Sequence, residues 1–245
     1  MGKVVAWLDR KFYPDLGNNW DDEQLRKRIL RCMQPESRVL DFGAGRGYVE
    51  AVNFKDAAKW IAGVDVDPAV RTNPHLHESA VLEPPTFAIP FPDASFDLVF
   101  ADNVLEHLEN PEGPMREIAR VLRPGGVFIG KTPSKWHYMP IISRLTPLAF
   151  HRFYNRLRGR RVIDTFPTFY RCNTRGAAKK CAMHAGLRVE KIEFIDGRPE
   201  YLRLSWFTYL IGILYERSVN RYGLLAPFRA VLIAQFRKPG PVQFR

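Results

Sequence analysis

Short apolar runs alternate with amphipathic segments along most of this chain, and the alternation predicts strands interleaved with helices. We expect strands at residues 38–42, 60–64, 79–83, 96–101, 127–131, 187–195 and 230–236. Helical periodicity, capping residues and turn signals predict helices at residues 21–33, 48–58, 111–122 and 173–184. Strands that alternate with helices favour a doubly wound α/β fold, whose ligands lie beyond the carboxyl ends of its parallel strands.

A glycine-rich turn follows the first of these strands. Gly43, Gly45 and Gly47 let the backbone turn sharply where side chains would block a ligand, and the expected helix 48–58 would point its first amides at that ligand. The dinucleotide fingerprint G-x-G-x-x-G would need a third glycine at position 48, which is Tyr48. The spacing therefore predicts a nucleotide-like ligand and disfavours NAD.

Polar side chains follow several strands at the edge where this ligand is expected. Asp41, two residues before the first glycine of the turn, suits an ammonium group better than a pyrophosphate. Asp65 ends the second strand at about the place where a carboxylate accepts hydrogen bonds from ribose hydroxyls. Asp102 and Thr132 follow the fourth and fifth strands. We expect the ligand and the chemistry to share this edge.

Four ordered motifs resemble those of the class I S-adenosylmethionine-dependent methyltransferases, in particular the type 11-like group. They read VLDFGAGRG from Val39, GVDVDP from Gly63, PFPDASFDLVFADNVLEHL from Pro90 and REIARVLRPGGVFIGKTPS from Arg116. The resemblance implies a Rossmann-like, doubly wound sheet of seven strands with the last strand antiparallel, and a lid insertion after the fifth strand. It implies S-adenosyl-L-methionine as the cofactor and says little about the methyl acceptor.

The resemblance also assigns roles to residues at the predicted sheet edge. Asp41 would hold the methionine end of the cofactor together with the glycine turn, and Asp65 would bind the ribose. Asp102 and Asn103 would line the pocket floor. Members of the family usually carry an acidic residue near the adenine after the third strand, and here the sequence offers Glu83 followed by two prolines. The predicted cofactor-binding residues are Asp41, Gly43, Ala44, Gly45, Gly47, Asp65, Val66, Glu83, Asp102 and Asn103.

The methyl transfer that the resemblance implies needs alignment and, for a hydroxyl acceptor, a base. His107 follows the fourth strand, where the family brings acceptor and cofactor together; a purely local hydrogen bond at a helix start explains it equally well. His137 and Tyr138 are further catalytic candidates, with loop packing as their alternative. Related O-methyltransferases carry a metal-binding E-x-x-E-H run here, but Asn103 replaces its first glutamate, so no metal site is predicted.

Composition adds constraints on class and compartment. The 245 residues fit one α/β domain with an ample core. The chain shows no signal-peptide pattern and no apolar run near the roughly 18 residues that span a bilayer, which predicts a cytoplasmic protein. Cys32, Cys172 and Cys181 lack C-x-x-C spacing and are predicted to be packing residues. Within a single domain of residues 1–245 we distinguish a leading cap helix in 1–35, a cofactor-binding core in 36–133, a basic lid in 134–172, the C-terminal half of the sheet in 173–237 and a tail in 238–245.

Positive charge, +11 for the whole chain at pH 7, is concentrated in one segment. Residues 135–180 contain eleven Lys or Arg residues against one acidic residue, Asp164, and residues 151–161 interleave arginines with aromatic side chains. Such a patch can bind nucleic acid phosphates, an anionic membrane or a phosphate-bearing substrate, and a solvated basic face is the alternative. Arginine favours a bidentate grip on phosphate or carboxylate.

A second segment, residues 201–222, carries a nearly continuous apolar and aromatic run. It fits a helix in a membrane interface, a helix buried on the sheet, or a dimer contact. We predict methyl transfer to a hydroxyl or carboxylate of a small or lipid-linked, anionic acceptor, including glycan intermediates, with peripheral contact to an inner membrane surface kept open. The alternatives are an RNA methyltransferase that uses the basic lid, and a non-catalytic cofactor-binding or membrane-associated protein.

Overall fold

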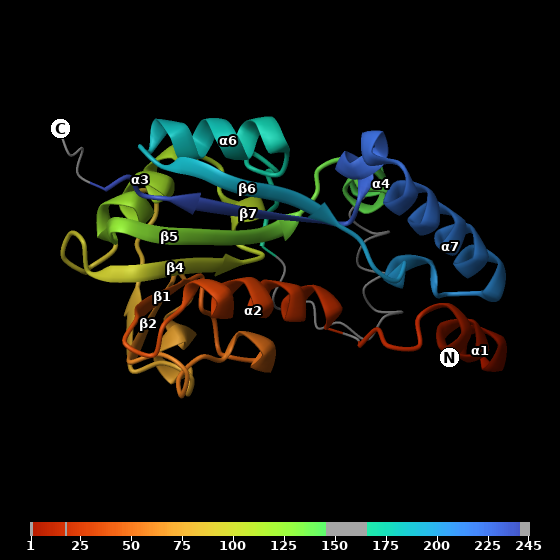
Figure 1. The fold of residues 1–245 in the computed structure, drawn as a ribbon, viewed down its shortest axis with the longest axis horizontal. Coiled ribbons are helices and arrows are strands. Elements are labelled where there is room, and N and C mark those ends of the chain that lie inside the picture. Colours follow the sequence, from red (N-terminus) through yellow and green to blue (C-terminus); the bar gives the residue numbers. More distant parts are fainter. Residues whose placement is uncertain (1, 18, 146–165, 241–245) are drawn as a thin grey trace.

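The computed structural model describes residues 2–17, 19–145 and 166–240, and a seven-stranded sheet forms its centre (Figure 1). Its strands are β1 (Arg38–Phe42), β2 (Trp60–Asp65), β3 (Glu78–Val81), β4 (Phe96–Asp102), β5 (Leu122–Pro133), β6 (Arg188–Ile195) and β7 (Val231–Arg237). They lie in the order β3-β2-β1-β4-β5-β7-β6. The pairs among β1 to β5 are parallel, whereas β7 is antiparallel to both β5 and β6. The predicted doubly wound sheet with an antiparallel last strand is thereby confirmed.

Helices pack on both faces of this sheet and bury its central strands on both sides. The longer helices are α1 (Lys3–Phe12), α2 (Trp20–Cys32), α3 (Glu112–Val121), α4 (Tyr138–Leu145), α6 (Arg175–His184) and α7 (Trp206–Arg221). Along β1, Leu40 points into a core shared with Ile118 of α3 and Ala178 of α6. Its neighbour Val39 points the other way, into a core shared with Ile29 of α2.

Most predicted elements are present within a few residues of their expected bounds. The helices expected at 21–33, 111–122 and 173–184 correspond to α2, α3 and α6. Short 3₁₀ turns fill several of the connections between strands: Glu50–Val52, Pro68–Thr72, Leu105–His107, Glu200–Leu202 and Gly223–Phe228. The division of the single domain into a cap, core, lid and tail stays a prediction.

The helix expected at residues 48–58 is wrong. Only Glu50–Val52 forms a 3₁₀ turn, and Asn53 is extended, with its side-chain oxygen accepting a hydrogen bond from the Lys55 amide at 3.1 Å. The guanidinium of Arg26 on α2 then donates to the freed carbonyls of Ala51 and Asn53, at 3.0 and 2.7 Å. A side chain from another element thus replaces the helical hydrogen bonds, and no long helix points its amides at the glycine turn.

Three helices gather at one end of the molecule, beyond the carboxyl ends of β4 and β5 (Figure 1). These are α1, α4 and α7, of which α4 belongs to the predicted lid 134–172. The basic run 151–161 and Asp164 lie outside the described residues. The carboxyl edge of the sheet therefore faces this three-helix cap.

No helix in the described ranges combines the length and the apolar character needed to cross a bilayer.

Candidate active site

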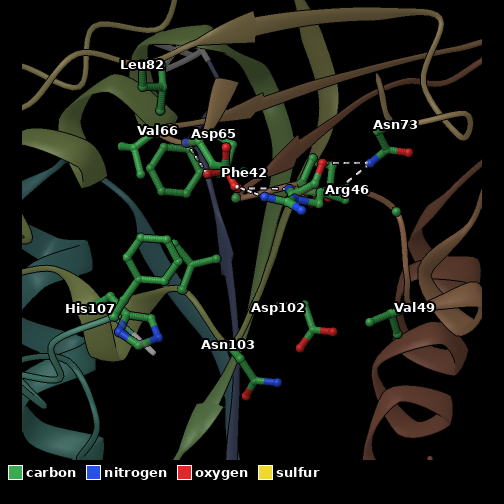
Figure 2. A pocket seen from close by; sticks show the side chains of 18 of the residues that line it. Phe42, Arg46, Val49, Asp65, Val66, Asn73, Leu82, Asp102, Asn103 and His107 are labelled. Atoms are coloured by element: carbon green, nitrogen blue, oxygen red, sulfur yellow. Dashed lines mark hydrogen bonds and ion pairs between the residues drawn. The ribbon is translucent and has the colours of Figure 1, made fainter. Parts of the chain in front are cut away.

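A cavity of about 550 Å³ opens at the carboxyl ends of β1, β2 and β4. In Figure 2, Asp65 and Val66 lie on one side of it, and Asp102, Asn103 and His107 lie on the other. This is the edge at which parallel α/β sheets bind ligands, and the volume suits a cofactor-sized molecule. Its lining includes the predicted residues Asp41, Gly43, Ala44, Gly45, Gly47, Asp65, Val66, Asp102, Asn103 and His107.

The glycine turn is folded against its neighbours by close backbone contacts. The amides of Gly43 and Ala44 both donate to the carbonyl of Val64 on β2, at 2.7 and 3.1 Å. A Cβ on Gly43 would lie 2.2 Å from a methyl of Val104, so that glycine is required by packing. Gly45 instead has φ +49° and faces open space on the cavity side. At Gly45 the backbone of the turn is therefore accessible to a ligand in the cavity.

Asp65 fixes the glycine turn through its carboxylate. One oxygen accepts a hydrogen bond from the Gly45 amide at 2.8 Å, and the other accepts from the Asp67 amide at 2.8 Å. A carboxylate oxygen has two lone pairs, so each oxygen keeps the capacity to accept a further bond. Asp65 can hold the loop and bind ribose hydroxyls at the same time.

Asp41 and Asp102 are buried carboxyl groups in the cavity wall. Burial raises the pKa of Asp41 well above its usual range, and the nearby charges of Asp102 and Asp65 raise it further. Among the described residues, none donates a hydrogen bond to the Asp41 side chain. Burial also raises the pKa of Asp102 to about 6, although Lys131 opposes that rise. A cation placed here would supply the countercharge that Asp41 lacks.

Lys131 on β5 ties this wall to α2. Its side chain is fully buried, and its ammonium lies 2.9 Å from Asp102 Oδ1 and 2.9 Å from Asp21 Oδ2, with Asp22 as a third partner. Burial alone would lower the pKa of Lys131, but the carboxylates of Asp102, Asp21 and Asp22 outweigh it, so the pKa is raised and the group stays charged. The start of α2 is thereby fixed beside the cavity.

His107 lies in an apolar part of the cavity wall. Its Nδ1 is 2.7 Å from the carbonyl oxygen of Pro167, and its ring meets Phe166 edge-on, with centroids 5.9 Å apart. Because a carbonyl can only accept, Nδ1 carries the hydrogen and Nε2 has the free lone pair in the neutral ring. The ring is therefore held in the tautomer that a general base needs.

Glu106 supports His107 from the buried side. Its Oε1 lies 4.0 Å from His107 Nε2, while its Oε2 accepts a hydrogen bond from Thr132 Oγ1 at 2.7 Å. Thr132 in turn accepts from Asn173 Nδ2 at 2.7 Å. Burial is the largest influence on Glu106 and raises its pKa. Glu106 and Asn173 are not among the predicted site residues, because neither carries a local sequence signal of these contacts.

The other predicted site residues lie elsewhere. Glu83 is exposed and does not belong to the cavity lining, which continues instead with Leu82, Pro84 and Phe87. His137 is buried in an aromatic cluster, 4.0 Å from Tyr138 and 6.0 Å from Tyr215 between ring centroids, and burial lowers the pKa of His137 to about 4. The structure does not bring His137 or Tyr138 into the cavity with His107, and their catalytic roles stay predictions.

Asn73 is a cavity residue that the sequence analysis missed. Its amide nitrogen donates to the carbonyls of Ala44 and Gly45, at 3.0 and 3.3 Å, and thereby braces the glycine turn from outside. Asn73 follows a short 3₁₀ turn after β2 and has no motif of its own. Only the chain path places it beside the loop.

Comparison with known proteins identifies the core. Residues 40–130 match a family model described as a methyltransferase domain. The core of this chain resembles a methyltransferase domain. This domain is 35% identical over 164 residues to a probable S-adenosylmethionine-dependent methyltransferase of Mycolicibacterium smegmatis, with 62% of each chain covered. It is 32% identical over 119 residues to a malonyl-[acyl-carrier protein] O-methyltransferase of Halorhodospira halophila, with 44% of this chain and 40% of that protein covered.

The alignments thus span less than two thirds of the length of these relatives. The methyltransferase domain also resembles a chain in the complex between the Haloferax volcanii Trm112 methyltransferase activator and the putative methyltransferase. That match has a TM-score of 0.56 at 20% identity and covers 98% of this chain and 99% of the other. Together these comparisons show that the core is similar to methyltransferase domains, among them that of a probable S-adenosylmethionine-dependent enzyme, in agreement with the predicted resemblance.

Proposed function

We propose that this protein transfers the methyl group of S-adenosylmethionine to an oxygen of a small or lipid-linked acceptor. The observation that carries the proposal is a cavity lined both by buried carboxylates and by His107, whose Nδ1 is 2.7 Å from the Pro167 carbonyl oxygen. When bound, the cofactor supplies an activated methyl group on a positively charged sulfur. Alignment of that group with an acceptor oxygen is then the main task of the protein.

The acidic wall fits the cationic end of this cofactor. Asp41 would pair with its ammonium group, and Asp65 would accept hydrogen bonds from its ribose while still holding Gly45. Asp102 keeps a partner of its own in Lys131, at 2.9 Å, and closes the floor of the cavity together with Asn103. Asp41 has no cationic partner within the part of the chain that the structure describes, and the positively charged ammonium group of the cofactor would supply one.

The acceptor end of the cavity is apolar around one base. Val104, Leu108, Phe166 and Pro167 line the wall near His107. These side chains exclude water and favour an acceptor with an apolar body, whose oxygen would lie within reach of His107 Nε2. A hydroxyl acceptor would give its proton to Nε2, and Glu106 would stabilise the imidazolium that forms.

The substitution His107→Asn tests this assignment, because the asparagine amide can keep donating to the Pro167 carbonyl but has no basic nitrogen. We expect kcat for a hydroxyl acceptor to fall by roughly 100-fold or more, as general-base catalysis typically contributes that much. Cofactor affinity, measured by calorimetric titration with S-adenosylmethionine, should stay unchanged. A carboxylate acceptor is already ionised and should react at the wild-type rate, so the same variant separates the two acceptor classes.

An equal loss of turnover and cofactor affinity in His107→Asn would contradict the base assignment and indicate a structural role. Cofactor binding without transfer to any acceptor would contradict the enzymatic proposal itself. An RNA acceptor makes a different prediction: its binding should weaken steeply with ionic strength, whereas that of a small neutral acceptor should not. The basic run that motivates this alternative lies outside the described residues.

A further inference from the structure

The outer stripe of α7 is apolar and exposed along its first half. Trp206, Phe207 and Leu214 are 54%, 59% and 69% exposed, and Ile211 between them is also exposed. The inner stripe of the same helix is buried, with Tyr209 and Ile213 in its centre. The sequence did not decide whether residues 201–222 form a buried helix or a surface helix. In the structure α7 is buried on one side and exposed on the other. Large apolar side chains clustered on a surface usually mark an interaction site.

Helix α1 lies beside α7 and exposes apolar side chains of its own. It packs on α7 through Val5 and Leu8, which share a core with Tyr209 and Ile213. The Tyr209 hydroxyl also donates to the buried carboxylate of Asp9, so the two helices are joined by polar as well as apolar contacts. On its outer side α1 exposes Val4 and Trp7. We call the six exposed side chains the α1–α7 face: Val4, Trp7, Trp206, Phe207, Ile211 and Leu214.

The charges around the α1–α7 face have one sign. The exposed charged side chains of the two helices are all cations: Lys3, Arg10, Lys11, Arg217 and Arg221. Their two acidic residues are buried, and Glu216 also pairs with the exposed Arg217 at 3.5 Å. Asp9 meets Arg203 and Tyr209, and Glu216 accepts a hydrogen bond from Tyr13 at 2.8 Å. The two helices therefore expose an apolar stripe together with charges that are all positive.

We propose that the α1–α7 face binds an anionic lipid bilayer. Tryptophan and cationic side chains around an apolar stripe are the composition of helices that lie in a membrane interface. With sixteen residues α7 is about 24 Å long, shorter than the roughly 30 Å hydrocarbon core, so it fits along the interface and not across it. A second copy of the chain fits poorly, because a symmetric contact would set cations against cations.

The position of this face suits a lipid-linked acceptor. Both helices belong to the cap beyond the carboxyl ends of the strands, the edge at which the cavity opens (Figure 1). A bilayer bound there would lie on the catalytic side of the molecule. This consequence for the acceptor rests on the proposed function, whereas bilayer binding itself does not require methyl transfer. The two can therefore fail separately.

The test is cosedimentation of the full-length protein with vesicles of equal parts phosphatidylglycerol and phosphatidylcholine, and with pure phosphatidylcholine vesicles. Wild type should bind the anionic vesicles and lose binding at high salt. The triple variant W206S/F207S/L214S should bind at least about tenfold more weakly, since its apolar contacts are gone. The charge variant K3Q/R10Q/R221Q should lose roughly fivefold for each cation removed.

Matched controls come from α6, which lies on the sheet away from the cap (Figure 1). Met183 is an exposed apolar residue there, and Lys179 and Lys180 are exposed cations. M183S and K179Q/K180Q should bind vesicles like wild type. Absence of wild-type binding, or binding that neither face variant weakens, would overturn the proposal. A concentration-dependent dimer that W206S/F207S/L214S abolishes, without vesicle binding by wild type, would assign the face to a second copy instead.

Discussion

Single residues set the shape of the cavity where the glycine turn passes closest to its neighbours. Gly43 and Gly47 are required by packing, because a Cβ at these positions would lie 2.2 Å from Val104 and 2.4 Å from Asn73. Gly45 is different: no atom lies within 4 Å of its hypothetical Cβ, and only its φ of +49° disfavours a side chain. The space beside Gly45 is therefore where a ligand is expected to approach the backbone.

Gly45→Leu tests that expectation, with Gly125→Leu as its control. Gly125 also has a positive φ, +84°, and open space, but it lies in the turn at the other end of β5. Both variants should lower the free energy of unfolding by about 1–2 kcal/mol, because both force a side chain into the left-handed region. Only Gly45→Leu should abolish S-adenosylmethionine binding in calorimetric titration. Retained affinity in that variant would remove Gly45 from the cofactor site.

Secondary-structure elements are joined around the cavity by charged and polar side chains that reach across long sequence distances. Lys131 of β5 connects to α2, Arg26 of α2 caps the carbonyls after the glycine turn, and Asn173 before α6 connects to β5 through Thr132. Cys172 and Cys181, predicted to be packing residues, lie with their sulfur atoms 3.2 Å apart, Cys172 shortly before α6 and Cys181 within it. None of these contacts follows from local sequence.

Removing the Lys131 ammonium should destabilise the protein strongly. Lys131→Met would leave the carboxylates of Asp21, Asp22 and Asp102 close together without their buried cation. We expect a loss of about 3–5 kcal/mol in urea denaturation at pH 7, the usual effect of breaking a buried ion pair. Lys191→Met removes an exposed ion pair with Glu193 on β6 and should cost less than about 1 kcal/mol. Similar losses in both variants would show that the Lys131 cluster is not effectively buried.

At the scale of the whole molecule, a second group of titratable residues lies between the sheet edge and the cap. Asp196 follows β6, and burial raises its pKa to about 7, with Glu216 of α7 adding to the rise and Arg229 opposing it. Its Oδ2 is buried and accepts no hydrogen bond from the described residues. Burial therefore favours the protonated form of the Asp196 carboxyl group in the folded protein.

Stability should respond to pH with the sign that this raised pKa dictates. The folded state holds the Asp196 proton up to about pH 7, while the unfolded chain releases it near pH 3.9, so this group lowers the free energy of unfolding as pH rises between those values. Asp196→Asn should therefore be more stable than wild type at pH 8, by up to about 4 kcal/mol, and nearly equal to it at pH 4. Thermal unfolding at the two pH values measures this.

Glu117→Gln provides a control of opposite sign. Arg120 lowers the pKa of Glu117, so that carboxylate stabilises the fold when it is ionised, and the contribution disappears as pH falls through the lowered pKa. The glutamine variant should be less stable than wild type at pH 8. If Asp196→Asn were destabilised at pH 8 in the same way as Glu117→Gln, the carboxyl of Asp196 would be stabilising in its charged form, contrary to its burial.

The sequence by itself determined the alternation of strands and helices, the glycine turn, and the acidic residues at the ends of β1, β2 and β4. Each of these depends on neighbours within a few positions: apolar residues that bury a strand, glycines that permit positive φ, and a side chain that directly follows a strand. Parallel strands then bring Asp41, Asp65 and Asp102 to one edge without further information. The acidic part of the cavity lining was predictable for this reason.

Only the tertiary structure decided the surroundings of His107, the conformation of residues 48–58 and the burial of α7. The tautomer of His107 depends on a carbonyl sixty residues later, the helix expected at 48–58 yields to the guanidinium of Arg26, and α7 is buried on one side because α1 packs there. These outcomes depend on hydrogen bonds and burial between distant segments, whose energies outweigh local propensity and leave no periodic trace along the chain. The path of the folded chain determines which of its side chains meet.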